Sequence, residues 1–183
     1  AFIGPLFGIL LVDYYLIKNE LDNIRWSIRE EKSFEWNPSL YNVSALFAEM
    51  LVNNYDSLDT RLRHFGRKLA FIPAYYNAAK QNIKNPSNVH TDLAISQNLG
   101  GISVFDQDLK AALQRSGLSE TEKAEITTRA DQAVSAIKGF TEWLKNLDNK
   151  SPRSFRLGAD LYRDKFAFDI QSAHSVADIY RKA

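Results

Sequence analysis

The chain opens with a long stripe of apolar residues at helical spacing. Alternating steps of four and three from Ile3 reach an apolar or aromatic residue every time, a heptad pattern that a strand cannot produce. The stripe predicts one helix over about Pro5 to Glu31. Up to Val12 this helix is apolar on all sides, so we expect that end to be buried all round and the rest to lie half-exposed along a bundle. The positions reached are Phe7, Leu10, Tyr14, Ile17, Leu21, Ile24 and Ile28.

Shorter helical segments follow, and we expect them to lie against the first helix. Pro38 suits a first helical turn with Asn37 as its cap, and the pattern continues to about residue 54. Ser57 caps a third helix that Pro73 ends or kinks, because proline lacks a backbone donor. Further segments run over about 74–84, 91–99 and up to 115, and Gly100–Gly101 is a hinge or tight packing point.

A second long helix begins at Ser119, where Glu122 three residues later completes a capping box. Another helix is predicted from about Ala159, and Ser175 with Asp178 starts a last one by the same logic. No run alternates as a strand would, so the fold class is all-α, a multi-helix array built around two long helices with no sheet. The core stripe of the second long helix is Ile126, Ala130, Ala133, Val134, Ile137, Thr141, Leu144 and Leu147.

The composition excludes some classes of function but does not identify the function. The 183 residues suit a single domain, and 45% apolar with 25% charged residues is a globular composition. A net charge of +1 argues against a nucleic-acid footprint, and the absence of cysteine excludes disulfides and thiolate metal sites. The apolar run Phe2 to Val12 is shorter than the ~20 residues of a membrane span, so a membrane is not expected as a partner.

The candidate chemical groups favour structural roles. His64, His90 and His174 lack a second ligand at helical spacing, so none is predicted to hold a metal. The acidic pairs Glu30–Glu31 and Asp106 with Asp108 suit solvated surfaces better than acid–base work. Lys150, Arg153 and Arg156 could grip an anion but more often pair with acids, and Trp26, Trp36, Tyr75, Tyr76 and Trp143 are expected in the core.

Several blocks of sequence carry a family resemblance. They are FEWNPSLYN at 34–42, DTRLR at 59–63, IPAYYNAA at 72–79, NP at 85–86 with HTDLAI at 90–95, WL at 143–144 and RSFRLG at 153–158. Their order and sequence resemble a bacterial family known as domain of unknown function 885.

The resemblance implies more than the residues do. Members resemble helical zinc metallopeptidases whose H-E-x-x-P-G-H signature lies in a carboxyl-terminal half absent from this chain. That half would supply zinc and the general base and would be the partner of this one, with a peptide as substrate. Many members look like exported proteins or lipoproteins. No catalytic, cofactor-binding or metal residue is transferred to this chain.

A second resemblance covers only the start. GPLFGI at 4–9 and DYYLI at 13–17 are similar to a transmembrane segment of nucleobase–cation symporters. The predicted organisation is an apolar leader over 1–12 and a helical domain over 13–183, truncated at its carboxyl end.

The favoured function is the amino-terminal helical scaffold of a metallopeptidase-like protein, which walls a substrate cleft while the catalytic half lies elsewhere. A non-catalytic helical interaction module and a membrane-protein fragment are the alternatives. Truncation predicts a solvent-facing apolar patch near the end, dye binding or self-association, and early proteolysis after Asp169. The patch would comprise Phe166, Phe168, Ile170, Val176, Ile179 and Tyr180.

Overall fold

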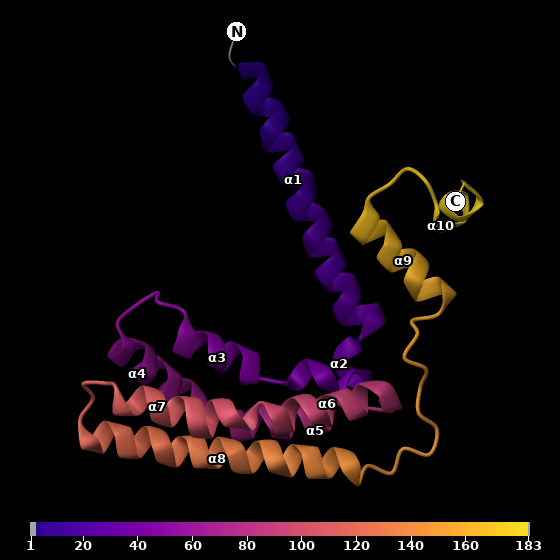
Figure 1. Cartoon of the computed structure of the whole chain (residues 1–183). Helices are drawn as coiled ribbons and strands as arrows, with labels where there is room; N and C mark the ends of the chain where they lie inside the picture. The colour runs from indigo at the N-terminus through magenta and orange to yellow at the C-terminus, as the bar shows by residue number, and fades with distance from the viewer. Residues whose placement is uncertain (1–2, 183) are drawn as a thin grey trace. The chain divides into compact units, whose positions relative to one another are not determined.

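All regular elements of the structure, a computed structural model, are helices (Figure 1). It describes residues 3–182, with side chains from residue 8 onward. No strand occurs in that part, which confirms the all-α prediction. The chain forms two compact units: unit 1 takes both ends of the chain, up to Ser33 and from Arg156, and unit 2 is Phe34–Phe155.

Unit 2 is organised by α8 (Glu120–Lys145), the second long helix. Three helices pack along it: α4 (Leu58–Leu69), α5 (Ile72–Asn82) and α6 (Asn88–Gly100). The remaining elements complete the unit. They are α2 (Ser33–Trp36), a 3-10 turn η2 (Pro38–Tyr41), α3 (Ser44–Val52), a π-helical turn η3 (Val104–Asp108) and α7 (Leu109–Gln114).

The second long helix begins and packs as predicted. Glu122 accepts the Ser119 N–H at 2.9 Å and donates its own N–H to the Ser119 hydroxyl at 3.3 Å, so the capping box is formed. The predicted stripe from Ile126 to Leu144 faces the core. Phe140 was not predicted but is fully buried, with its ring centroid 4.8 Å from that of Tyr76. Trp143 is half-buried and stacks on Phe140 at 6.0 Å.

The predicted helix over 38–54 is broken in two. Its Asn37 cap is correct, since the Asn37 side chain accepts the Ser39 N–H at 3.1 Å. Asn42 then leaves the helical conformation, and its side-chain oxygen accepts both the N–H and the hydroxyl of Ser44, at 3.1 and 2.8 Å. Asparagine often competes in this way with the helical backbone, so α3 starts only at Ser44.

Two other breaks match the sequence. Pro73 lies in the first turn of α5, and α4 ends before it at Leu69. Gly101 is a tight packing point, because a Cβ there would lie 2.3 Å from the Ser44 side chain.

Unit 1 contains α1 (Ile3–Trp26), which continues as the π-helical turn η1 (Ser27–Glu31), with α9 (Ala159–Ile170) and α10 (Val176–Lys182). α9 lies against α1. The Trp26 and Phe168 rings are 5.8 Å apart, and the Asn19 side chain donates to the Phe168 carbonyl at 3.1 Å. The Ser175 and Asp178 capping pair at α10 is formed, as predicted.

The long apolar stripe of α1 is exposed, contrary to its predicted burial. Its residues from Leu10 to Ile28 are between 45% and 61% exposed. The expectation of burial all round is also wrong for Ile9 to Val12, while Phe7 and earlier side chains lie outside the described residues. A stripe indicates that a helix needs a partner, and α9, the helix of unit 1 that lies against α1, leaves the stripe exposed. Among the described helices, none is long and apolar enough to cross a bilayer.

Candidate functional site

The three histidines do not come together. His64 is in α4, His90 in α6, and His174 is exposed between α9 and α10. Across residues 3–182, no cluster of three or more histidine, aspartate or glutamate side chains could hold a metal ion. The described residues therefore offer no ligand set for the zinc that the resemblance implies.

His90 belongs to a packing cluster around the start of α6. Its Nδ1 lies 2.6 Å from the hydroxyl of Ser87, the buried cap of that helix. The His90 and Trp36 rings meet edge-on at 5.4 Å, and the Arg153 guanidinium lies 4.0 Å over Trp36. Burial, and then the charge of Arg153, lower the pKa of His90. A neutral imidazole thus fits a structural role.

The other charged candidates show no assembled chemistry. Asp106 and Asp108 are both exposed, and so is Glu30. Lys150 pairs with Asp148 at 3.4 Å. Arg153 lies over an aromatic ring, as described, and Arg156 belongs to unit 1.

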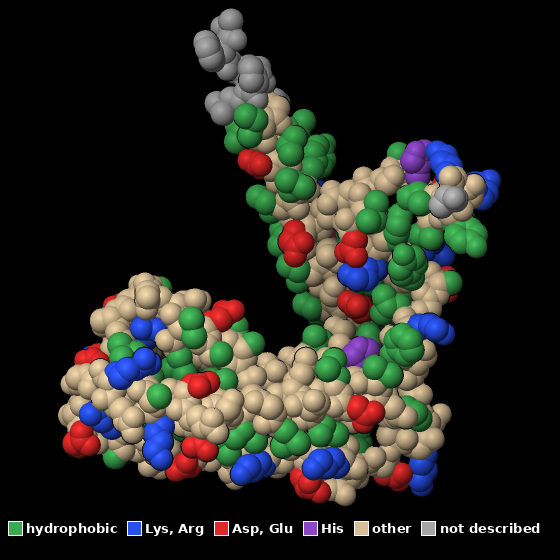
Figure 2. Space-filling view, viewed as in Figure 1, with side chains coloured by type: hydrophobic (Ala, Val, Ile, Leu, Met, Phe, Trp, Pro, Cys, Tyr) green, Lys and Arg blue, Asp and Glu red, His purple; other side chains and the backbone are tan. Residues whose placement is uncertain are grey.

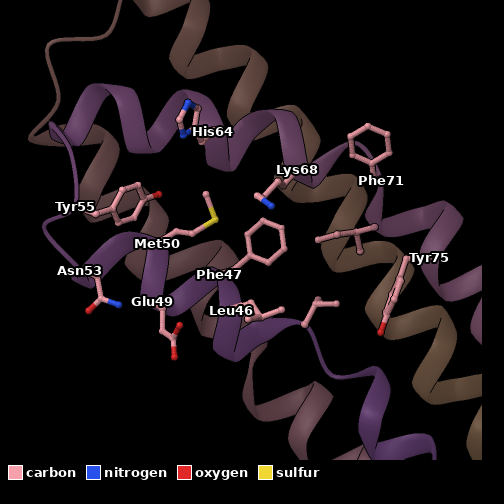
Figure 3. Close-up of a pocket in the computed structure, with 12 residues that line it drawn as sticks. Leu46, Phe47, Glu49, Met50, Asn53, Tyr55, His64, Lys68, Phe71 and Tyr75 are labelled. Carbon is pink, nitrogen blue, oxygen red and sulfur yellow. The ribbon is translucent and has the colours of Figure 1, made fainter. Parts of the chain in front are cut away.

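The best-formed site is a cavity of about 590 Å³ between α3 and α4, called here the α3–α4 pocket (Figure 3). It lies entirely within unit 2. Tyr55 closes one end and Tyr75 the other. Apolar side chains dominate the lining. These are Val43, Leu46, Phe47, Met50, Phe71 and Ile72.

The floor of the pocket is made of packed aromatic rings. Phe47 is buried, with its ring centroid 4.7 Å from that of Phe65 and 5.1 Å from that of Phe105. The Phe65 ring meets Phe47 edge-on and the Phe105 ring is tilted against it, which are geometries that aromatic pairs favour. The rim, in contrast, leaves Leu46 68% and Phe71 71% exposed. An apolar floor below uncovered apolar rims is typical of a site that receives an apolar group.

Three charged or titratable side chains line the same pocket. His64 and Lys68 come from α4, and Glu49 comes from α3. None of these side chains makes a hydrogen bond or ion pair with the described residues, so their polar atoms can bind a ligand. Tyr75 adds a phenol whose pKa is raised by burial and by Tyr41, which keeps it a hydrogen-bond donor. An apolar pocket with a few polar groups of this kind suits the binding of a ligand.

Arg61 holds the turn that bears Asn53 and Tyr55. Its guanidinium donates to the Met50 and Leu51 carbonyls at 3.1 and 2.8 Å, and to the Asp56 carbonyl at 3.1 Å. These bonds satisfy the last carbonyls of α3 and attach the following turn to α4. This role of Arg61 could not be predicted from the sequence, because arginine on an amphipathic helix usually faces water.

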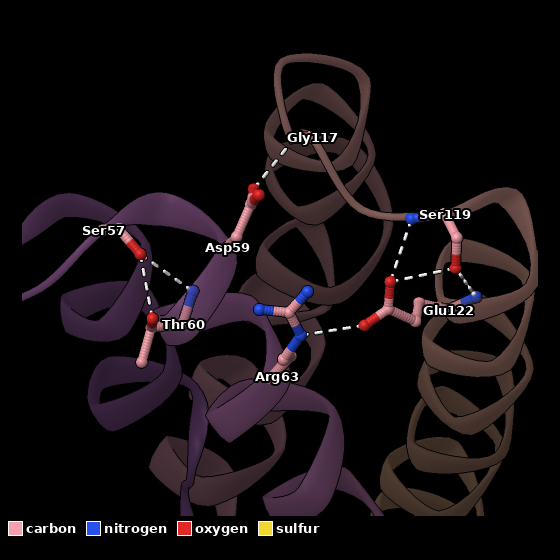
Figure 4. A network of polar contacts seen from close by, with 7 residues as sticks. All are labelled: Ser57, Asp59, Thr60, Arg63, Gly117, Ser119 and Glu122. Atoms are coloured by element: carbon pink, nitrogen blue, oxygen red, sulfur yellow. Dashed lines mark hydrogen bonds and ion pairs between the residues drawn. The ribbon is translucent and has the colours of Figure 1, made fainter.

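A polar network joins the starts of α4 and α8 (Figure 4). Asp59 accepts the Gly117 N–H at 2.9 Å, and Arg63 binds the Glu122 carboxylate at 2.8 Å. The Arg63 guanidinium, followed by Ser119, lowers the pKa of Glu122 from 4.5 to about 2. The network thus ties the α4 wall of the pocket to the helix that organises unit 2.

Two predicted core aromatics, Trp36 and Tyr76, are buried, and Trp26 and Trp143 are half-buried. Tyr75 is exposed at the pocket, so its core prediction is wrong. Adjacent tyrosines on a helix cannot both face the core, since successive residues point about 100° apart. Two features of the sequence could have indicated the pocket. One is the pair of adjacent tyrosines, and the other is the position of Leu46 and Phe71 outside the core stripes.

Comparison with known proteins identifies the family. The model of the family described as "Bacterial protein of unknown function (DUF885)" matches residues 10–183. The chain belongs to this family. The predicted resemblance is therefore confirmed, whereas the likeness of residues 1–17 to a symporter finds no support. No curated protein matches the chain.

One solved structure matches the fold along almost the whole chain. It is described as a "putative lipoprotein of unknown function from Shewanella oneidensis", with 44% sequence identity and a TM-score of 0.88. The match covers 93% of this chain and 32% of that protein, so the chain spans about a third of its relative.

Proposed function

We propose that this chain is the amino-terminal helical scaffold of a longer DUF885 protein, and that its α3–α4 pocket forms part of the wall of a peptide-binding cleft. The observation that carries the proposal is the pocket itself. Its volume of about 590 Å³ lies within the usual range for sites that accept a small ligand. The apolar floor would receive a large apolar side chain.

The free polar groups suit the backbone of such a peptide. Lys68 and His64 can donate to carbonyl or carboxylate oxygens, and Glu49 can accept from an amide or amine. An apolar cavity with a few convergent polar groups is a common way to fix a peptide's orientation.

The hydrolytic part of the proposal concerns the rest of the longer protein. The metallopeptidase resemblance assigns zinc and the general base to sequence outside this chain, and the absence of a metal-binding cluster among the described residues is compatible with that division. We further propose export or lipid anchoring of the longer protein, supported by the description of the Shewanella relative as a lipoprotein.

Peptide binding by the chain is tested by amide chemical-shift mapping with the tripeptide Ala-Phe-Ala as probe. Shifts should concentrate on residues of α3, on His64 and Lys68 of α4, and on the start of α5. Leu46→Asp places a charge at the apolar rim and should weaken binding. Val89→Asp, at an exposed apolar position of α6 outside the pocket, is the matched control and should bind as wild type does. Equal binding by both variants, or shifts elsewhere, would contradict the proposal.

Hydrolysis is tested separately on a full-length family member. Cleavage of an unstructured protein substrate that a zinc chelator abolishes would support the metallopeptidase role. Peptide binding by the pocket without any cleavage by the full-length protein would instead favour a non-catalytic interaction module.

A further inference from the structure

An uncovered apolar surface runs along α1 in unit 1. The α1 stripe, defined as Leu10, Tyr14, Ile17, Leu21, Ile24 and Ile28, stays exposed over its full length. Figure 2 shows hydrophobic side chains following this helix. A contiguous apolar surface of this kind usually marks an interaction site.

The stripe carries a hollow shaped for another side chain. A depression of about 250 Å³ lies over Tyr14, Ile17, Lys18 and Leu21, and Asp22 and Arg25 also line it. Four residues at these spacings form the hole into which a facing helix inserts a knob. The surface therefore fits a packed helix better than a small ligand.

A second copy of this chain is a poor match for the whole surface. In a two-stranded coil the stripe forms the seam, but Val12, Tyr15 and Leu16 point away from that seam and are also exposed. Pairing two such helices would leave these residues in water. A body that surrounds the first half of α1 on several sides would cover them.

A lipid surface fits no better. Acidic residues outnumber basic ones between Gly8 and Glu31, whereas helices that lie on anionic membranes are rich in lysine and arginine. Lys18 and Arg25 are also engaged by Asp22, at 2.6 and 3.6 Å. The charges beside the stripe thus compensate one another within the helix.

The length of the solved relative points to the occupant. That protein shares its fold with 93% of this chain, yet this chain accounts for only 32% of it. About two thirds of the relative is therefore additional protein. We propose that the α1 stripe is the docking surface for this additional part of the full-length family protein, whose helices insert side chains into the stripe. The inference rests on the proposal that this chain is part of a longer protein. It does not depend on peptide binding by the pocket or on hydrolysis.

One pair of substitutions measured in two chain lengths tests the proposal. Ile17→Asp with Ile24→Asp is made in the chain as it stands and at the aligned positions of the full-length Shewanella protein. In the full-length protein both charges would be buried, so the thermal midpoint should fall by ~5 °C or more. In the shorter chain both sites face water, so the midpoint should stay unchanged while binding of a hydrophobic dye is lost. Glu20→Ala with Arg29→Ala, at exposed polar positions of the same helix, is the control and should alter neither readout.

The alternative occupants give different results. An unchanged midpoint in the full-length protein would overturn the proposal, because the stripe would then face solvent. A dimer of the shorter chain that the aspartates dissociate would assign the surface to a second copy, and sedimentation with anionic vesicles would assign it to a membrane. If the full-length double variant is insoluble, Ile24→Ser is measured instead, with a smaller fall in midpoint expected. None of these readouts depends on peptide binding or cleavage.

Discussion

At the scale of the residue, Arg61 holds several backbone carbonyls in place through hydrogen bonds from its guanidinium. Only 6% of the residue is exposed, and its charge is compensated by carbonyl oxygens rather than by a carboxylate. A buried guanidinium with several acceptors is stable because each N–H has a partner. It also orders the turn that carries Asn53 and Tyr55 at the pocket.

Replacing Arg61 should therefore destabilise unit 2. Arg61→Met keeps the aliphatic volume but leaves the carbonyls at the end of α3 without donors, and should cost about 3 kcal/mol of unfolding free energy. Urea titration measures the loss. Arg67→Met, at an exposed arginine of the same helix, is the control and should cost little. Equal losses in the two variants would mean that the Arg61 contacts are not stabilising.

The ionisation of Glu122 predicts how the stability of the folded chain changes at acid pH. Its folded pKa of about 2 lies below its ordinary 4.5, so the ionised form is stabilised by folding. That stabilisation is fully present above pH 4.5 and is lost as the pH falls from 4.5 toward 2. Glu122→Gln should thus flatten the decline of stability across this window, measured by urea midpoints at successive pH values. Glu49→Gln is the control, because the Glu49 carboxylate has no partner among the described residues, and it should retain the wild-type decline. A wild-type decline in Glu122→Gln would refute the low folded-state pKa of Glu122.

At the scale of the element, features that depend on residues close in sequence could be predicted. Features that depend on packing between separate helices could not. The start of α8 follows from Ser119 and Glu122, two residues that interact across one turn. The break before α3 depends on which partner the Asn42 side chain selects, so the sequence left it undecided. The α3–α4 pocket joins residues from Val43 to Tyr75. Its shape depends on the packing of separate helices, which periodicity does not encode.

The close approach of α4 to α8 gives a prediction at this scale. A Cβ on Gly66 would lie 2.7 Å from Cγ1 of Ile126, so Gly66→Ala should push the helices apart and cost ~1–3 kcal/mol. Gly139 lies on α8 with nothing near its Cβ position, so Gly139→Ala should stabilise the helix by ~0.5–1 kcal/mol. Thermal unfolding of both variants compares them. Opposite signs are expected, and a stabilising Gly66→Ala would contradict the packing.

At the scale of the whole molecule, the chain divides into two units of different character. Unit 2 has a continuous core that includes Phe65, Tyr76 and Phe140. In unit 1, none of the helical residues whose side chains are described is buried. Helical periodicity correctly identified α1 and α9, but could not assign burial because that depends on what packs against each helix.

This difference predicts the order of proteolysis. The end after Asp169 carries only the seven-residue α10, with Tyr180 almost fully exposed, so trypsin should cut at Arg181 and Lys182 before it cuts inside α8. Mass spectrometry of a time course identifies the first products. Initial cleavage at Lys138, within α8, would contradict the expected order.

Unit 1 draws its helices from opposite ends of the chain, and this has a consequence for synthesis on the ribosome. Unit 2 is continuous, so it can fold as soon as residue 155 has emerged. α1 is made first, yet its neighbour α9 is made only after all of unit 2. The apolar α1 must therefore stay uncovered at least until the whole of unit 2 has been made. A nascent chain stalled at a length at which residue 155 has emerged from the ribosome but α9 has not should hold a protected unit 2 and an α1 that is open to chaperones.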